Sequence, residues 1–259
     1  MYGISLLSCG LTAICLRKVA DKLPLSPGRI PVSAGVVFLF VYLPLLPWQP
    51  KYLMLGLSVV AFWMVGLIDD LRELPAWARL RIEGLLAVIL IISGWQLHWF
   101  SSPWIDLPVT FLWIVGITNA FNLIDNTDGL CAGITFTAAV FLATITGSVA
   151  AYALVGICLA FWIFNFPPAM MWMGDCGSLF LGVNMACLSM DSKIGMWAIL
   201  ILIVPIADTI FVVARRISES RSPFQGGKDH LSHELGKWAL PVLYLAGFLG
   251  GGLATWLIL

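Results

Sequence analysis

The sequence predicts an all-α membrane protein, a polytopic bundle of about ten transmembrane helices that forms one domain over residues 1–259. Composition is the first observation behind this prediction: 60% of the residues are hydrophobic, 11% are charged, and the mean hydropathy is +0.96. A soluble domain carries about 25% charged residues. The other two observations are apolar stretches that recur along the whole chain and basic residues that sort onto alternate loops.

A helix needs roughly 17–25 apolar residues to cross a bilayer, and fewer at the ends of a tightly packed bundle. The first apolar stretch lacks a leading basic region and a clear cleavage site, so we interpret it as a retained span rather than a signal peptide. The predicted spans lie near residues 1–16, 32–47, 52–68, 82–98, 108–121, 130–147, 150–165, 177–190, 195–213 and 239–258.

Basic residues orient these spans. Threading ten spans puts twelve of the 14 basic residues on one side, and only Lys51 and Lys193 fall on the other. The positive-inside rule makes the first side cytoplasmic and places both termini outside. All acidic residues except Asp106 and Asp191 lie on the cytoplasmic side too, which the rule does not require. We therefore expect a polar cavity there, built from the loops 17–31, 69–81, 122–129, 166–176 and 214–238.

Charge and cysteine content exclude other classes. The formal net charge is zero, so nothing indicates a nucleic-acid partner. The six cysteines are scattered through apolar stretches without a CxxC pair, which favours small apolar fillers over a disulfide framework or a metal cluster.

The first polar motif is the pair Asp69-Asp70 at the end of the third span. Adjacent helical residues diverge by about 100°, so one carboxylate can meet a substrate while the other holds a neighbouring base or a metal-bound water. A solvated pair of charges at a helix end is the alternative interpretation.

The second motif covers residues 118–129. Asn119, Asn122 and Asn126 are spaced i, i+3, i+7, with Asp125 beside them, which predicts a polar stripe at the end of an apolar helix. Unpaired polar groups in hydrocarbon cost several kcal/mol, so the stripe needs partners. Carboxylate and amide oxygens suit Mg²⁺; hydrogen bonding between helices is the alternative.

The third motif covers residues 165–178. Pro167 and Pro168 break a helix, and Gly174 and Gly177 let the backbone approach closely around Asp175. The next span opens here, and a helix start is a favourable place for a phosphate. A structural turn with Asp175 as the N-cap is the alternative.

The fourth motif is the basic loop 214–238. His230 and His233 have the spacing of one helical face. Zinc needs a third ligand, and Glu234 adjoins His233 rather than having the spacing of a His-Glu-x-x-His site. Donors for a diphosphate fit this loop better, and a purely topogenic loop with incidental histidines is the alternative.

Taken in order, these four segments resemble the polyprenyl-phosphate N-acetylhexosamine-1-phosphate transferases of glycosyltransferase family 4. The resemblance runs over about residues 21–235. It implies a multi-pass protein of the inner (plasma) membrane with its active site at the cytoplasmic face. The implied reaction moves a sugar 1-phosphate from a UDP-N-acetylhexosamine to polyprenyl (undecaprenyl) phosphate and releases UMP. It also implies a Mg²⁺ cofactor, with Mn²⁺ as an alternative; a homodimer is compatible with the sequence but is not predicted by it.

Residue roles follow from matching the motifs of that family. For the reaction itself we favour direct in-line attack by the lipid phosphate, with Asp69 removing or orienting its proton and Asp70 positioning the partners of Asp69; a covalent phospho-aspartate route is the alternative. The catalytic residues so implied are Asp69, Asp70 and Asp125; the metal ligands are Asn122 and Asp175; the substrate-binding residues are Asp128 (uracil), Asn119, Arg79, His230 and His233.

Two departures from the family bear on the donor. The tight His-x-His-His of the family is His230-Leu231-Ser232-His233 here, which argues for a GlcNAc-like donor, as in enzymes that start O-antigen lipopolysaccharide, and against the phospho-MurNAc-pentapeptide branch of cell-wall synthesis. The first cytoplasmic loop matches only loosely, at residues 21–24 and 29–35.

Two rival functions are weaker. An ion-coupled transporter predicts charges near the membrane midplane and two related halves, and the sequence has neither. A catalytically inactive relative would serve in assembly, but the intact Asp69, Asp70, Asn122 and Asp175 count against it.

Overall fold

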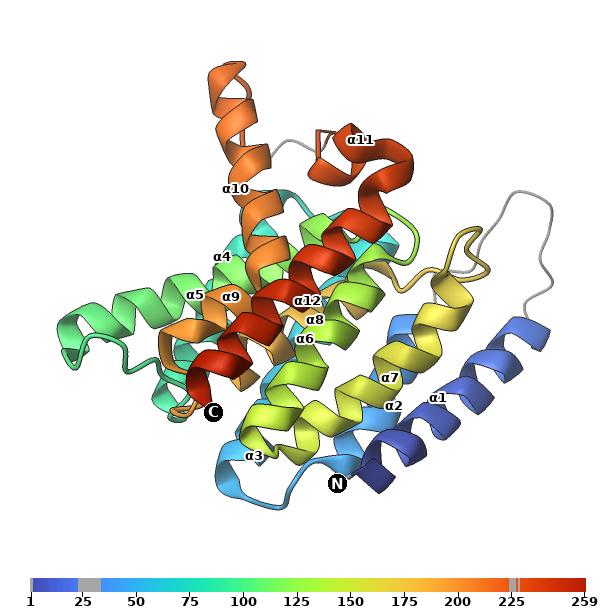
Figure 1. Ribbon diagram of the computed structural model, residues 1–259, viewed down its shortest axis with the longest axis horizontal. Coiled ribbons are helices and arrows are strands. Elements are labelled where there is room, and N and C mark those ends of the chain that lie inside the picture. The colour runs from blue at the N-terminus through green and yellow to red at the C-terminus, as the bar shows by residue number, and fades with distance from the viewer. Residues whose placement is uncertain (1, 23–33, 224–226, 228) are drawn as a thin grey trace.

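A computed structural model describes residues 2–22 (of 20–22 only the backbone), 34–223, 227 and 229–259. This part of the chain is all-α, as predicted, and contains no β-strand (Figure 1). Its helices are α1 Tyr2–Lys22, α2 Ala34–Tyr42, α3 Pro50–Arg72, α4 Ala76–Ile92, α5 Pro103–Ile124, α6 Leu130–Thr146, α7 Val149–Asn165, α8 Gly174–Leu188, α9 Ala198–Ile201, α10 Ile203–Ser218, α11 Leu231–Leu235 and α12 Ala239–Ile258, with 3-10 turns at Leu43–Leu45, Gly195–Trp197 and Gly236–Trp238.

Helix α8 is the core of the bundle. Every residue of it from Cys176 to Leu188 is buried, because α2, α3 and α5 pack around it. Outside this group, α1 packs on α7, α7 on α6, and α6 on α12. Figure 1 shows the two termini toward the end of the bundle opposite α11. The polar residues at the start of α8 are therefore fixed by the best-packed element of the fold.

Helices α3 and α8 approach each other so closely that a glycine is required between them. A Cβ built on Gly66 would overlap the backbone of Asp175 and Cys176. Small residues allow such backbone-to-backbone packing in membrane bundles. Close packing matters there because lipid tails are as apolar as the side chains, so the hydrophobic effect does not drive helices together. The contact brings the end of α3, with its two aspartates, against the first turn of α8.

Each predicted span overlaps a helix, but several bounds were wrong. The stretch 82–98 corresponds to α4, which begins directly after Pro75 and ends at Ile92, with Ser93 as its C-cap. Pro75 disfavours helical backbone in the residue before it, and Gly94 beyond the C-cap adopts φ +93°, which ends the helix. Helix α5 begins at Pro103, five residues before the predicted start, with proline in its first turn. The span 195–213 is broken: the Gly195–Ile201 and Ile203–Ser218 helices meet at 71°.

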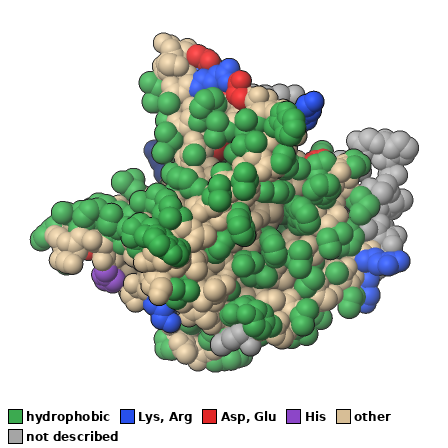
Figure 2. All heavy atoms as spheres, in the orientation of Figure 1, with side chains coloured by type: hydrophobic (Ala, Val, Ile, Leu, Met, Phe, Trp, Pro, Cys, Tyr) green, Lys and Arg blue, Asp and Glu red, His purple; other side chains and the backbone are tan. Residues whose placement is uncertain are grey.

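Length and composition allow four of the described helices to cross a membrane, or five when the bent pair counts as one span. Further apolar helices of 10–17 residues, among them α6, α7 and α8, are shorter. Hydrophobic side chains cover much of the face in Figure 2, and charged side chains gather mainly around the tip of α10 and at the edges. A multi-pass membrane protein is thus supported, whereas ten spans and the side of the termini stay predictions.

The α3–α8 contact makes a stability prediction. We expect Gly66→Ala to lower the melting temperature markedly, because the clash is with backbone atoms that cannot rotate away and overpacking costs about 1–3 kcal/mol. Gly252→Ala on α12 is the control, since a Cβ there meets no atom within 4 Å. Thermal unfolding in detergent measures both; equal melting temperatures would contradict the close packing.

Candidate active site

An acidic cavity opens where the ends of α3 and α5 meet the start of α8. Its described lining holds no lysine, arginine or histidine, and its polar residues are Asp70, Asn122, Asp125, Asn126, Thr127, Asp128, Asn165 and Asp175. These residues come from three of the four sequence motifs. The structure thus brings Asp70, Asn122 and Asp175 to one hollow, as the site hypothesis required.

The carboxylate of Asp70 caps helix α8. Its two oxygens accept hydrogen bonds from the backbone N–H groups of Asp175 (2.7 Å) and Cys176 (3.1 Å). The first-turn N–H groups of a helix have no partner within the helix, and its dipole favours an anion there. Asp70 thus occupies two of the N–H groups of this helix start, where a phosphate stays a prediction, and the alternative of Asp175 as the N-cap was wrong, because Asp175 lies inside the first turn of α8.

Asn122 connects the end of α5 to α8. Its amide nitrogen donates to Asp175 Oδ1 (2.7 Å) and to Ser178 Oγ (2.9 Å). Both amide hydrogens are used in this way, so the carbonyl oxygen of Asn122 and the second oxygen of Asp175 are left as ligands. Two such oxygens fit a hard divalent cation that completes its shell with water and substrate oxygens. No cluster of three His, Cys, Asp or Glu suited to a metal occurs among the described residues.

The turn that follows α5 supplies the remaining carboxylates. Helix α5 ends at Ile124, so Asn126 lies in a turn and the predicted helical stripe was too long. Burial, and then the neighbouring carboxylates of Asp175, Asp70 and Asp128, raise the pKa of the Asp125 carboxyl well above its usual range. Asp128 accepts hydrogen bonds from Ala169 N–H (3.2 Å) and Trp172 Nε1 (3.1 Å). It thus ties the turn to the 166–173 segment.

Asp69 faces away from the acidic cavity and lines neither it nor the neighbouring cavities. One of its oxygens accepts the Leu74 N–H (2.6 Å) and the other binds Arg79 Nη1 (2.7 Å). The same guanidinium lies 3.7 Å from Asp175 and 3.6 Å from Glu83. Arg79 is therefore shared by three carboxylates, and both oxygens of Asp69 are committed to local contacts.

A second cavity lies on the other side of Asn122. It is mostly apolar, and its polar lining is Arg79, Asn119, Asn122, Thr209 and Arg216. An apolar groove between α5 and the bent α9–α10 pair adjoins it and shares Gly116 and Thr209 with it. Asn122 is the residue common to the acidic and second cavities. An apolar path therefore leads to a basic group next to the carboxylates.

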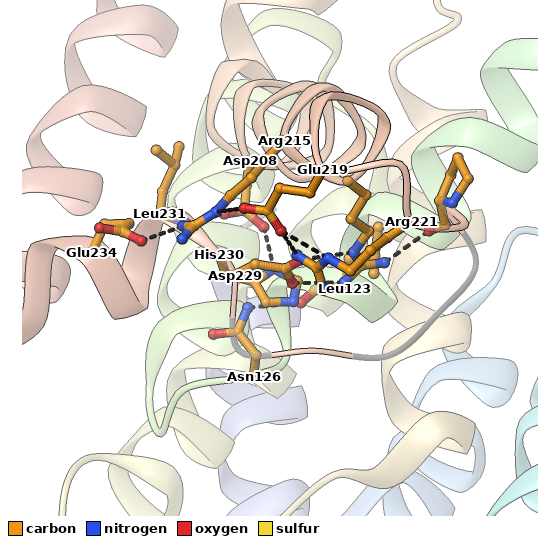
Figure 3. Close-up of polar contacts among 12 residues, drawn as sticks. Leu123, Asn126, Asp208, Arg215, Glu219, Arg221, Asp229, His230, Leu231 and Glu234 are labelled. Atoms are coloured by element: carbon orange, nitrogen blue, oxygen red, sulfur yellow. Dashed lines mark hydrogen bonds and ion pairs between the residues drawn. The ribbon is translucent and has the colours of Figure 1, made fainter.

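The loop after α10 is held by two buried carboxylates, as Figure 3 shows. Asp208 accepts the Leu231 N–H (2.8 Å) and contacts Nδ1 of His230 (2.9 Å). Asp229 binds the guanidinium of Arg216 at 2.8 and 2.9 Å and also meets Arg221 at 2.9 Å. These contacts fasten the histidine-bearing segment to α10.

The two histidines differ in setting. His230 precedes α11 in extended backbone and is 4% exposed, whereas His233 lies in α11 and is exposed. Their ring centroids are 6.1 Å apart. Neither lines the acidic cavity, but Ser232 between them donates a hydrogen bond to Asn126 Oδ1 (2.5 Å). The loop thus reaches the rim of that cavity.

Residues 23–31 of the first predicted loop lie outside the described residues. At the start of α2, the N–H groups of Ala34 and Gly35 donate to the carbonyls of Trp172 (3.3 Å) and Met173 (3.2 Å). The start of α2 therefore adjoins the segment before α8.

Sequence reasoning missed two buried carboxylates. Glu83 is fully buried on α4, four residues after Arg79, a spacing that could have indicated an ion pair. Asp208 is 1% exposed on α10. A carboxylate inside an apolar stretch needs a partner, and this signal was present in the sequence.

Comparison with known proteins finds one family and several relatives that match most of the chain. The model of the family "Glycosyl transferase family 4" matches residues 52–193. The chain is 34% identical to a probable undecaprenyl-phosphate N-acetylglucosaminyl 1-phosphate transferase of Bacillus subtilis, over 90% of this chain and 73% of the relative. It is 31% identical to a phospho-N-acetylmuramoyl-pentapeptide-transferase of Heliobacterium modesticaldum, over 80% and 76%. An undecaprenyl-phosphate alpha-N-acetylglucosaminyl 1-phosphate transferase of Thermotoga maritima is 28% identical over 82% and 72%.

The buried Arg216–Asp229 pair predicts a pH dependence of stability. The Arg216 guanidinium holds the pKa of the Asp229 carboxyl well below its usual range. A lowered pKa adds stability above the ordinary carboxyl value of about 3.9, and that stability is lost as the pH falls through the folded-state pKa. We expect Asp229→Asn to lower the melting temperature at pH 7 by roughly 5 °C or more, because it leaves a buried guanidinium without its anion.

Melting curves between pH 7 and pH 3 measure this effect, and the gap between wild type and Asp229→Asn should narrow below about pH 4. Glu219→Gln is the matched control, since Glu219 is exposed and its ion pairs with Arg215 and Arg221 are solvated. A constant gap down to pH 3 would refute the assignment.

Proposed function

The chain belongs to glycosyl transferase family 4, and from this premise we propose that it transfers N-acetylglucosamine 1-phosphate from UDP-N-acetylglucosamine to undecaprenyl phosphate and releases UMP. The proposal rests most heavily on one observation. A carboxylate-lined cavity and an apolar cavity with basic groups meet at a single residue, Asn122. A nucleotide diphosphate bound with a cation suits the first, and a phosphate on a hydrocarbon chain suits the second.

The acidic cavity favours a divalent cation. Asp70, Asp125, Asp128 and Asp175 line it without a described basic neighbour in the lining, so a diphosphate alone would be repelled. We propose Mg²⁺, or Mn²⁺, held by Asn122 and Asp175; when bound it neutralises charge on the diphosphate and on the leaving UMP. We assign the uracil to Asp128, which lines the same cavity next to Trp172.

The second cavity and the apolar groove suit the lipid acceptor. The groove is lined almost wholly by apolar side chains of α5, α9 and α10, and it leads to Arg79 through the shared Gly116 and Thr209. Hydrocarbon gains about 25 cal/mol per Å² buried from water, and a phosphate prefers a guanidinium. The polyprenyl chain would lie in the groove with its phosphate near Arg79 and Asn122.

The protein's own residues then align and hold two anions. The second pKa of a phosphate monoester is near 6, so much of the lipid phosphate is a dianionic nucleophile at pH 7 and needs little help from a base. Asp69 is committed to Arg79 and to the Leu74 N–H, so we assign it the positioning of Arg79 instead of proton removal. Asp70 keeps α8 and therefore Asp175 in place.

His230 is oriented by Asp208 through its Nδ1, and with both ring nitrogens protonated its Nε2–H donates to a phosphate oxygen. His233 is exposed beside it, and we assign it a contact to the same phosphate. We place this site at the cytoplasmic face of the inner membrane, where nucleotide sugars are available, and the product would start a cell-envelope glycan.

The test is UMP release by purified protein with Mg²⁺, undecaprenyl phosphate and a panel of UDP-sugars. We expect release that requires both the lipid and a divalent cation, with UDP-N-acetylglucosamine the best donor. Asp175→Asn should lower kcat by 100-fold or more at unchanged melting temperature, because it removes a charged ligand of the cation. Preference for UDP-MurNAc-pentapeptide would favour the alternative branch, and lipid-independent or absent release would refute the proposal.

The apolar groove gives a separate prediction. Gly116→Leu should fill the junction of groove and second cavity, where a Cβ now meets no atom within 4 Å. The apparent KM for undecaprenyl phosphate should rise roughly tenfold, while that for a short-chain prenyl phosphate, which needs less of the groove, should change little. Gly252→Leu on α12 is the control; an unchanged KM for both lipids in Gly116→Leu would remove the groove from the acceptor site.

A further inference from the structure

Glu83 is a buried carboxylate that the motifs of this chain leave without a role. It lies on α4, is fully buried, and comes from outside the four polar motifs. Burying a carboxylate costs several kcal/mol unless it is paired and hydrogen-bonded. The polar side chains that contact Glu83 are those of Arg79 and Asn119, and both line the second cavity.

The hydrogen bond of Glu83 goes to Asn119. Asn119 Nδ2 donates to Glu83 Oε2 and, at 2.9 Å, to the Val115 carbonyl. Both acceptors are oxygens, so the amide must turn its nitrogen toward them. Both amide hydrogens are used in this way, so the carbonyl oxygen is the polar atom of Asn119 left for a ligand in the second cavity, which Asn119 lines.

Arg79 is not held in the same way. Its Nε lies 3.6 Å from Glu83 Oε1, which is an ion-pair contact but too long for a hydrogen bond, and both atoms are buried without a hydrogen-bond partner among the described residues. The directional contact of Glu83 is thus the one to Asn119, and Asp69 is the carboxylate that binds Arg79 directly.

We propose that Glu83 is a positioning residue for the acceptor: it fixes Asn119 so that a hydrogen-bond acceptor stands beside the Arg79 guanidinium in the second cavity, where the lipid phosphate binds. This inference rests on the proposed function. An anionic oxygen of the phosphate meets Arg79, and a water molecule that donates to Asn119 Oδ1 also donates to a second phosphate oxygen, because the dianion has no hydrogen of its own to donate.

Whether replacing Glu83 weakens or strengthens phosphate binding distinguishes a positioning role from a purely electrostatic one. Removing a buried anion makes the cavity more positive, so by charge alone a phosphate would bind more tightly. Losing the orientation of Asn119 weakens binding instead. A variant that removes charge and hydrogen bond together therefore reports which effect dominates.

The experiment is a double-mutant cycle read as the apparent KM for undecaprenyl phosphate. We expect Glu83→Leu and Asn119→Leu each to raise it on the order of tenfold, with the KM for UDP-N-acetylglucosamine within twofold of wild type. The double variant should be no worse than Asn119→Leu alone, because Glu83 acts through Asn119. Glu83→Gln, whose side-chain oxygen can still accept from Asn119, should stay within about threefold of wild type.

Thr118→Val is the matched control, since Thr118 is a buried residue of the same helix turn whose hydroxyl has no hydrogen-bond partner in the described structure. The rise in melting temperature on adding undecaprenyl phosphate gives a second readout that needs no turnover, so failure of the transferase reaction itself does not obscure the result. We expect Glu83→Leu to lose most of that rise and Glu83→Gln to keep it.

Three outcomes would overturn the inference. The KM increases of the two single variants could multiply in the double variant, which would mean that the two residues act independently. The change could be confined to the KM for the UDP-sugar, or Glu83→Leu could lower the KM for the lipid. If the wild-type protein releases no UMP in the presence of the lipid but its melting temperature still rises when undecaprenyl phosphate is added, the proposed reaction is refuted. The binding role of Glu83 is then still tested by the melting-temperature readout.

Discussion

The site depends on one close contact, the approach of α3 to the first turn of α8. Gly66 lets the two backbones touch, and four residues later the Asp70 carboxylate reaches the free N–H groups of Asp175 and Cys176. These N–H groups would otherwise lack partners in a buried helix start. The same bonds hold Asp70 and Asp175 next to each other despite their like charge. Packing and capping thus fix a carboxylate pair that electrostatics alone would separate.

The charge distribution around Asn122 follows from this arrangement. On one side, carboxylates of α3, α8 and the 125–128 turn face one hollow. On the other, Arg79 is surrounded by Asp69, Glu83 and Asp175 at 2.7 to 3.7 Å. One guanidinium among three carboxylates is more than neutralised, so Arg79 alone cannot attract two phosphate-bearing substrates. A cation bound by Asp175 would release part of Arg79's charge for the acceptor, which links the two halves of the site.

The sequence predicted which segments meet and much of the fold class. Motifs on alternate loops of a bundle must lie at one end, so Asp70, Asn122, Asp128 and Asp175 were expected together. Predictions of individual residue contacts were wrong where those contacts depend on how the helices pack. The cap of α8 comes from another helix, and nothing in the residues 174–178 shows that Asp70 will fill the position. The substrate-facing role was expected for Asp69, but the crossing of α3 with α8 turns Asp70 toward the cavity instead.

Glu83 and Asp208 also show that sequence alone does not identify long-range partners. Each lies in an apolar helix, and each has a partner from a different element: Asn119 of α5 and the segment before α11. A lone carboxylate in such a helix predicts that a partner exists, but sequence spacing names it only when both are on one helix, as for Arg79 and Glu83. Long-range partners need the three-dimensional arrangement.

Helix α10 serves both halves of the site. Its first turns, bent from α9 by 71°, form one wall of the apolar groove, and its Asp208 and Arg216 hold the loop that carries His230. That loop contacts the acidic-cavity rim through Ser232 and Asn126. A ligand that moves α10 from the groove side would therefore shift the histidine loop as well. Because buried carboxylates make both connections, the loop cannot move freely of the helix without leaving a charge unpaired. The fold thereby couples the apolar groove to the acidic cavity through helix α10.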